Sequence, residues 1–589
     1  MMISFFAVAT IASLAVCQPT RAQPQAAPTT PNAATYKQEA VAADHPLASA
    51  AGAEILAAGG NAVDAAVATS FTLSVVRPFS CGIGGGGFMV ISLPAHHGKP
   101  AVATAINYRE TCPAAIGPDY YEKLGEGEKN ASRHGGKAVA TPTTISGLLY
   151  ALEKYGTLDR QHVLAPAIKI ARNGFTADAP YAAAAIYTIE RFEKHPEFKA
   201  RFVFTWERFL GSGKLHEGDR VMLPEQAAAL ELIARDGIKA FTEGELGRAI
   251  CEAAKADGGV LTLDDLKSYK PAELDPIRFE AFGRTFLTMP PPSSGGVALA
   301  QMFGIMQRQD AVGMVQRKEW APYTHTMIEG FKHAFADRAE WMADPAFVDV
   351  PIKRLLSEKY LDERAAQIKK TTTQGPEFYG TRATPPPDDG GTSHLCVIDS
   401  HGGAVACTET INLVFGSLLP VDKYGFILND QMDDFTTRRG EPNAFHLTQS
   451  DRNLPAAGKR PLSSMTPTIV LDKDGKVEAI AGASGGPRII TGTAQVLLNA
   501  LLLGLTASES VARPRVHHQW MPNLLEIEDN YPGRWQGIQV RVWMQKLHHQ
   551  TIEAKDHCAV QLIKRTSVEG EQCWEAASDP RKGGCPAGK

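Results

Sequence analysis

The feature that most constrains this chain is a turn-rich stretch followed directly by a β-hairpin. Residues 385–389 read PPPDD, which favours turns and extended chain because proline fixes φ and lacks an amide N–H. Residues 392–398, TSHLCVI, and residues 404–411, AVACTETI, are apolar, β-branched runs separated by the turn residues 400–403, SHGG. This pattern predicts a hairpin whose first strand begins within a residue or two of Thr392.

The position of Thr392 suggests a chemical role for its side chain. Because the preceding residues favour turns, we expect Thr392 to follow a flexible, exposed segment and to start a strand, which is where a new chain terminus can form. Cleavage of the Gly391–Thr392 bond would leave one residue with a hydroxyl nucleophile and a free α-amine. An α-amine has an unperturbed pKa of ~8 and can act as the base for that hydroxyl. The segment alone leaves open the alternative that Thr392 is an ordinary strand threonine.

Several further motifs surround this hairpin in a fixed order. They are residues 82–88 (GIGGGGF), 108–110 (YRE), 289–296 (MPPPSSGG), 410–412 (TIN), 429–435 (NDQMDDF), 460–465 (RPLSSM) and 484–486 (SGG). The set closely resembles the γ-glutamyltranspeptidase family of N-terminal-nucleophile hydrolases, from about residue 45 to residue 581. Strands and long helices occur in both halves of the chain, which predicts an α+β layered fold. The resemblance implies a four-layer αββα sandwich formed jointly by a large and a small subunit.

The resemblance implies a role for each residue of an acyl-transfer site. Thr392 would be the nucleophile and the residue at which the precursor cuts itself, between Gly391 and Thr392. Thr410 would orient the nucleophile. The pair Gly485-Gly486 lies at a strand-to-helix junction, where unpaired backbone N–H groups can stabilise an oxyanion. His394 is the nearest rival to the α-amine as the base.

The resemblance also assigns the groups that hold a γ-glutamyl substrate. Arg109 would bind its carboxylate, because a guanidinium can form two parallel hydrogen bonds to one. The other assigned residues are Ser463 and Ser464 for the carboxylate, and Asp434, Gln431 and Asn412 for the ammonium. Residues 438–459 match the segment that lids the pocket, with Phe445 as its aromatic gate. Asp430 departs from the family pattern, which has asparagine there. No metal and no cofactor are implied.

Length and composition, with the N-terminal segment, predict where the protein is located and how the chain is divided into segments. The net charge of −4 over 589 residues gives no reason to expect nucleic acid as a partner. Residues 3–16 are apolar but too short to span a bilayer, and small residues precede a cleavage point after Ala22. We therefore expect a signal peptide over 1–22, a linker over 23–44, a large subunit over 45–391 and a small subunit over 392–589. The protein would be periplasmic or secreted, and Cys17 leaves open a lipoprotein anchor.

Other patterns suggest sites that we consider and set aside. The glycine run 82–87 lacks a following GK[ST] and precedes a strand, so we expect close backbone approach rather than a nucleotide loop. His325, Glu329 and His333 recur at helical spacing, but without HExxH we expect a polar stripe on an exposed helix. A two-residue turn at His401-Gly402 would place Cys396 opposite Cys407. Cys573 and Cys585 are the more plausible disulfide pair.

These observations favour an autoprocessing γ-glutamyltransferase and glutathione hydrolase. Its donors would be glutathione and other γ-glutamyl compounds, and its acceptors water, amino acids or peptides. The large and small subunits would form a heterodimer from one precursor. One alternative is an acylase of the same fold that acts on cephalosporins with a glutaryl side chain. Another is a non-catalytic periplasmic binding homologue.

Overall fold

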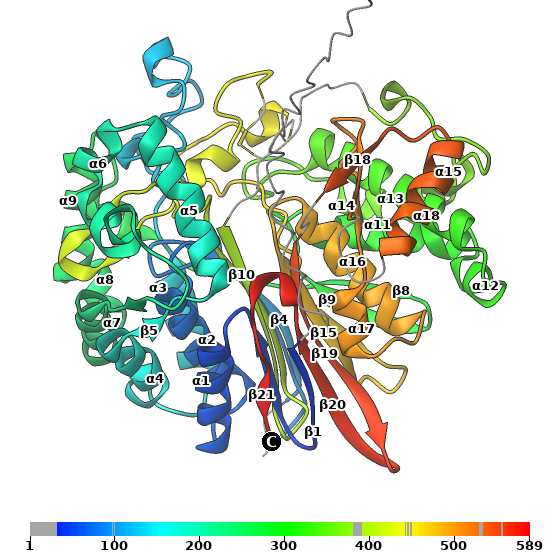
Figure 1. Cartoon of the computed structure of the whole chain (residues 1–589), viewed down its shortest axis with the longest axis horizontal. Helices are drawn as coiled ribbons and strands as arrows, with labels where there is room; N and C mark the ends of the chain where they lie inside the picture. The colour runs from blue at the N-terminus through cyan, green and yellow to red at the C-terminus, as the bar shows by residue number, and fades with distance from the viewer. Residues whose placement is uncertain are drawn as a thin grey trace, which may run out of the picture.

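The computed structural model describes residues 32–96, 98, 100–380, 391–441, 443–444, 447, 450–528, 534–554 and 558–589. Two seven-stranded sheets stack face to face at its centre, and helices cover the outer face of each (Figure 1). The first sheet has the strand order β21-β2-β10-β11-β3-β4-β7, and the second β1-β20-β19-β15-β14-β9-β8. The fold is therefore the predicted four-layer αββα sandwich of the α+β class.

The first sheet is built around the predicted hairpin. Its strands are β2 (Ala40–Ala43), β3 (Gly86–Leu93), β4 (Val102–Tyr108), β7 (Ala272–Leu274), β10 (Gly391–Ile398), β11 (Ala404–Asn412) and β21 (Ala587–Gly588). The helices on its outer side include α1 (Pro46–Ala57), α2 (Ala62–Val76), α3 (Thr144–Tyr155), α4 (Arg160–Asn173) and α7 (Pro224–Asp236). Every residue of α2 is buried, and its start is fixed by a capping box between Asn61 and Asp64. Small side chains on α2 allow it to pack closely against β10 and β11.

The second sheet carries the other helical layer. Its strands are β1 (Asn32–Tyr36), β8 (Ile277–Ala281), β9 (Arg284–Thr288), β14 (Thr468–Leu471), β15 (Val477–Ser484), β19 (Ala559–Val568) and β20 (Glu571–Ser578). The helices on its outer side include α11 (Gly295–Arg308), α13 (Trp320–Trp341), α16 (Arg488–Leu501) and α17 (Ala507–Ala512). Residues before 391 and residues after it contribute strands to both sheets, so the two segments are interleaved.

The glycine run permits close backbone contacts beside the hairpin. A Cβ on Gly85 would lie 2.1 Å from the carbonyl oxygen of Thr410, and one on Gly84 would lie 2.2 Å from that of Ile427. Real Cβ atoms do not approach backbone this closely, so any larger residue would push β11 away. The run thus has the role that we expected in place of phosphate binding.

The hairpin register differs from the one that we considered. Ile398 pairs with Ala404, which leaves a five-residue loop over 399–403, and Cys396 faces Ala406 rather than Cys407. The reason is Asp399, whose Oδ1 accepts hydrogen bonds from the N–H groups of His401 (2.9 Å) and Gly403 (2.8 Å). This side chain closes a wider loop than a two-residue turn.

The suggested disulfide is wrong, because Cys573 and Cys585 are both free thiols. Tyr36 pairs across the sheet with Trp574, and its hydroxyl donates to the carbonyl of Pro586 at 2.8 Å. The Cys585 segment therefore lies beside the face of Tyr36 and Trp574. Cys573 is the strand neighbour of Trp574 and points to the opposite face.

Residues that we expected in a linker, within 23–44, include two strands. β1 forms an edge of the second sheet, and β2 lies inside the first sheet with all four residues buried. The run Ala40-Val41-Ala42-Ala43 is small and apolar, which suits a strand covered on both faces. Residues 1–31, with the predicted signal peptide, Cys17 and Ala22, lie outside the described residues.

The polar stripe on α13 is buried rather than exposed, and His333 is not grouped with the other two residues. His325 and Glu329 lie near His549, with 2.9 Å between the Nδ1 of His325 and the Nε2 of His549. Lys332 Nζ donates to Glu329 Oε1 at 3.4 Å. The carboxylate therefore already has a buried cation beside it, and we read the cluster as a polar network in the core.

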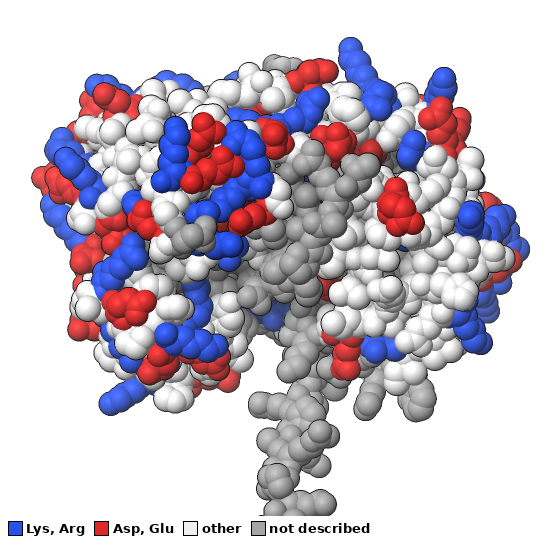
Figure 2. Space-filling model, turned by 90° about the horizontal axis from the view of Figure 1, so that it is seen from above, with Lys and Arg blue, Asp and Glu red and all other residues white. Residues whose placement is uncertain are grey.

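Two observations concern membrane association and charged partners. In the described ranges, no helix combines the length and apolar character needed to cross a membrane. On the face seen in Figure 2, acidic and basic side chains are interspersed rather than gathered by sign. A strong field of one sign is what nucleic-acid binding requires, and this face lacks it.

Candidate active site

Thr392 and Thr410 lie opposite each other in the hairpin, at the end that is distant from the 399–403 loop. Thr392 of β10 pairs with Thr410 of β11, and its hydroxyl donates to the Thr410 oxygen at 3.2 Å. The Thr410 hydroxyl donates in turn to the carbonyl oxygen of Gly391 at 2.6 Å and accepts from the N–H of Asn412 at 2.8 Å. Thr410 therefore holds both the Thr392 hydroxyl and the carbonyl of the preceding peptide bond.

The glycine pair lies at the end of β15, as predicted, directly before α16. Gly485 and Gly486 both have positive φ, 129° and 54°, which a residue with a Cβ adopts only with strain. Within the described residues, neither N–H group donates a hydrogen bond. Two free donors at a helix N-terminus are suited to an oxyanion.

The predicted residues converge on one small cavity, which we call the nucleophile pocket. Its volume is about 30 Å³. The predicted residues that line it are Arg109, Thr392, Thr410, Asn412, Gln431, Asp434, Ser463, Ser464 and Gly486. Gly485 lines an adjacent cavity together with Gly391 and Lys582. The Gly391–Thr392 peptide bond thus lies between two cavities.

The two charges expected to bind a substrate are paired with each other. A guanidinium nitrogen of Arg109 forms a short ion pair with the Oδ2 of Asp434. The amide of Gln431 also donates to that oxygen, at 2.6 Å. Burial raises the pKa of Asp434, and Arg109 opposes this shift. A zwitterionic ligand could replace both partners at once, with its carboxylate on Arg109 and its ammonium on Asp434.

Asn412, at the end of β11, and Ser463 line the same pocket. Asn412 has a positive φ of 80° and donates to the carbonyl of Asp430 at 3.0 Å. Ser463 Oγ accepts from the N–H of Met465 at 3.1 Å. Burial raises the pKa of Asp430 well above its usual range, which favours the neutral form that resembles the asparagine expected there.

Sequence reasoning missed three charged residues of this region. Lys582 donates to the carbonyl of Thr392 and, at 3.2 Å, to Ser484 Oγ, and it forms an ion pair with Asp44 at 2.8 Å. Arg338 lines the nucleophile pocket and is fully buried. Burial raises the pKa of Glu110 to about 7. Lys582 and Arg338 are distant from the motifs in sequence, and no local pattern marks them.

His394 does not contact the nucleophile. Its Nδ1 lies 2.7 Å from Thr408 Oγ1, and its Nε2 lies 3.4 Å from Cys396 Sγ. Burial between the two sheets lowers the pKa of His394 to about 3. The ring is a neutral core residue two positions along the strand from Thr392.

The expected lid lies against the pocket where it is described. Leu447 lines the cavity, and the side-chain amide of Asn443 donates to Asp434 Oδ1 at 3.4 Å. Arg439, in the same segment, pairs with Asp119 at 3.1 Å. Phe445, the predicted gate, lies outside the described residues.

Comparison with known proteins decides which family this site belongs to. A family model described as Gamma-glutamyltranspeptidase matches residues 48–588. The chain belongs to the γ-glutamyltranspeptidase family. It is 37% identical over 501 residues to the glutathione hydrolase proenzyme of Escherichia coli (strain K12), covering 84% of this chain and 83% of that one. It is 36% identical over 553 residues to the glutathione hydrolase proenzyme of Pseudomonas sp. (strain A14), covering 92% of each.

A solved structure agrees with the fold of this family member. The crystal structure of cephalosporin acylase from Bacillus halodurans superposes with a TM-score of 0.78, covering 98% of this chain and 99% of that one. The two sequences are 24% identical, so the likeness concerns the fold and not the substrate.

Proposed function

We propose that this protein is an autoprocessing γ-glutamyltransferase and glutathione hydrolase. The hydrogen-bonded chain from Thr392 through Thr410 to the Gly391 carbonyl carries the proposal. The Thr392 hydroxyl would attack the Gly391 carbonyl carbon, and Thr410 would donate to the oxygen on which negative charge develops. The C–N bond then breaks, the acyl group passes to the Thr392 oxygen, and the nitrogen takes up the hydroxyl proton and becomes an α-amine. Water hydrolyses this ester and releases the new terminus.

The processed site would perform the same acyl chemistry on a substrate. The α-amine of Thr392 takes the hydroxyl proton, and the oxygen attacks the γ-carbonyl of glutathione or another γ-glutamyl compound. The N–H groups of Gly485 and Gly486 would stabilise the oxyanion, each by about 3 kcal/mol. The amine leaves, and water, an amino acid or a peptide then accepts the acyl group from Thr392.

The paired charges favour a γ-glutamyl donor over a glutaryl one. The head of a γ-glutamyl group carries a carboxylate and an ammonium, which complement Arg109 and Asp434 respectively. Asn412 and Gln431 would assist Asp434, and Ser463 and Ser464 would assist Arg109. A glutaryl group lacks the ammonium and would leave the buried Asp434 without a cation, which argues against the acylase alternative.

The proposed processing has two consequences, one for the subunits and one for where the protein is located. The precursor would lose residues 1–22 as a signal peptide and be cut before Thr392. The large subunit ending at Gly391 and the small subunit 392–589 would remain together as a heterodimer. We place the enzyme in the periplasm or outside the cell, with amino acids or peptides as acceptors.

The intact mass of the purified protein tests this proposal. We expect two chains, the smaller beginning at Thr392, and release of a chromogenic anilide from its γ-glutamyl derivative. A single uncut chain without turnover would support the non-catalytic alternative. Two chains with turnover of a glutaryl anilide but not a γ-glutamyl anilide would support the acylase.

A further inference from the structure

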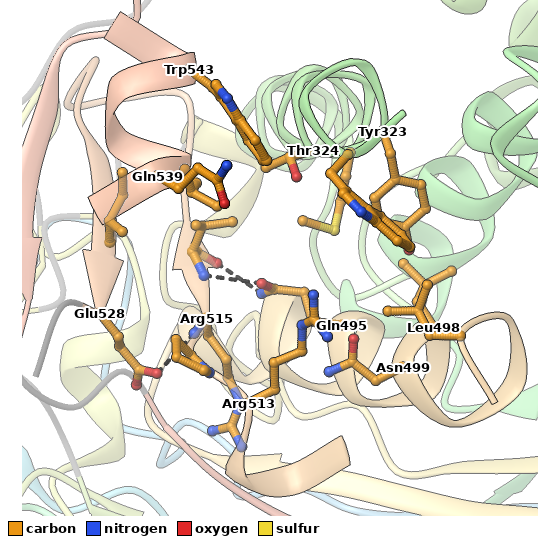
Figure 3. Close-up of a pocket in the computed structure, with 17 residues that line it drawn as sticks. Tyr323, Thr324, Gln495, Leu498, Asn499, Arg513, Arg515, Glu528, Gln539 and Trp543 are labelled. Carbon is orange, nitrogen blue, oxygen red and sulfur yellow. Dashed lines mark hydrogen bonds between the residues drawn. The ribbon is translucent and has the colours of Figure 1, made fainter. Parts of the chain in front are cut away.

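A second cavity lies on the outer side of the second sheet, remote from Thr392. We call it the Arg513 pocket. Its volume is about 210 Å³. It is lined by residues of α13, α16, β17 (Leu525–Glu528), α18 (Arg534–Lys546) and the segment 513–516 (Figure 3). A cavity of ~150 Å³ suffices for benzene, so this one can hold a ring with a short substituent.

The walls of the Arg513 pocket are largely aromatic and aliphatic. Trp320 and Tyr323 come from the start of α13, and Trp543 comes from α18. Met327, Leu498, Leu503 and Val540 line the same space. In Figure 3, Trp543 lies across the cavity from Arg513 and Asn499, with Tyr323 to one side. Aromatic side chains in this arrangement favour a flat apolar group between them.

Arg513 brings a positive charge into this apolar space. Its side chain is half-buried, and burial lowers the pKa of its guanidinium. Across the described residues, no carboxylate forms an ion pair with it. The nearby acids are engaged elsewhere, since Asp579 pairs with Arg515 at 2.5 Å and Glu528 with Arg581 at 2.6 Å.

A half-buried guanidinium without a carboxylate is a site prepared for an anion. A charged group that loses water without a partner raises the free energy of the folded state, and an incoming anion would offset that loss. The single uncompensated charge matches a monoanion rather than a polyphosphate. The apolar walls require that the anion carry hydrophobic surface.

We propose that the Arg513 pocket binds a small aromatic carboxylate, with its carboxylate on Arg513 and its ring among Trp320, Tyr323 and Trp543. Both tryptophans line the cavity, so their fluorescence reports occupancy directly. The site does not depend on the proposed function of Thr392, because none of its residues lines the nucleophile pocket.

The test uses phenylacetate as the probe, titrated into the processed full-length protein and followed by tryptophan fluorescence and calorimetry. We expect saturable binding of phenylacetate and at least roughly tenfold weaker binding of phenylacetamide, which keeps the ring but not the charge. Acetate, which keeps the charge but not the ring, should also bind at least tenfold more weakly. Saturation with glutathione should not displace phenylacetate.

Variants locate the probe. Arg513→Gln should weaken phenylacetate at least tenfold and leave phenylacetamide unchanged, and Arg513→Lys should recover part of the loss. Trp543→Leu should weaken both ligands. Arg278→Gln, an exposed arginine on β8, is the matched control and should change neither. Circular dichroism checks that each variant folds.

Three results would overturn the proposal. They are the absence of saturable phenylacetate binding to the wild-type protein, equal affinity of folded Arg513→Gln for phenylacetate, and displacement of phenylacetate by glutathione. The last would place the probe in the nucleophile pocket.

Discussion

The nucleophile pocket and the Arg513 pocket differ in whether their arginine has a carboxylate partner. In the first, Arg109 is neutralised by Asp434, and the cavity measures about 30 Å³. In the second, Arg513 has no carboxylate partner among the described residues, and the cavity measures about 210 Å³. A site for a zwitterion can store its two complementary charges as an ion pair, whereas a site for an anion cannot. Binding of a zwitterion in the first pocket would therefore exchange one ion pair for two.

Thr392→Ala should have the largest effect, because it abolishes the chemistry of the nucleophile pocket and leaves binding in the Arg513 pocket unchanged. Without the hydroxyl, neither processing nor acyl transfer can occur, so the chain should remain whole and release no anilide from γ-glutamyl anilide. Phenylacetate should still bind, because the Arg513 pocket contains no part of the hairpin. Mass spectrometry and the anilide assay measure the first result. Cleavage of this variant at the same bond in protease-free buffer would refute the nucleophile assignment.

Thr410→Val should slow processing by about a hundredfold to a thousandfold, because it removes the donor to the Gly391 carbonyl. The variant keeps the branched shape of the side chain, so the β10–β11 pairing should survive. A time course of precursor loss on a denaturing gel provides the rate. Thr410→Ser retains the hydroxyl and serves as the control, with a rate near that of wild type.

Asp434→Asn should separate the role of the Asp434 carboxylate from that of the Arg109 guanidinium in the nucleophile pocket. Leaving a buried charge uncompensated costs roughly 3–5 kcal/mol, so we expect kcat/KM for γ-glutamyl anilide to fall by at least about tenfold. The loss for a glutaryl anilide should be smaller, or its rate should rise, because Arg109 is then free for an anion. Processing should continue. An equal loss on both donors would mean that Asp434 supports the fold instead of reading the substrate.

Lys582→Gln should have the smallest effect, a shift in the pH profile. The ammonium of Lys582 lies at the Thr392 carbonyl, and a nearby cation disfavours protonation of the α-amine. Its loss should raise the apparent pKa of the base only modestly, because Asp44 already offsets part of the charge. Activity would then fall at the acid side and persist at the alkaline side. Lys582→Arg should restore the profile, whereas a uniform loss at every pH would indicate a structural role alone.

The sequence predicted what is local in the chain or carried by family motifs. The hairpin from Gly391, the layered α+β class and the convergence of residues from Arg109 to Gly486 all follow from such patterns. The loop closed by Asp399 was missed because side-chain acceptors can widen a turn without changing the strand pattern. Lys582 and His549 were missed because tertiary packing alone brings them to their partners. The pairing of Arg109 with Asp434 was missed because sequence motifs do not show which side chains contact each other.

The interleaving of the two segments has a consequence for how the mature protein refolds. Before cleavage, β10 pairs with β2 and β14 pairs with β9 of the N-terminal segment within one molecule, so refolding is a first-order process. After the proposed cleavage at Gly391, each sheet would be assembled from two molecules, and neither would hold a complete sheet. Unfolding then releases two chains, and the gain in translational entropy favours the unfolded side as the protein is diluted. The melting temperature of the mature enzyme would rise with its concentration, while that of the uncut precursor would not.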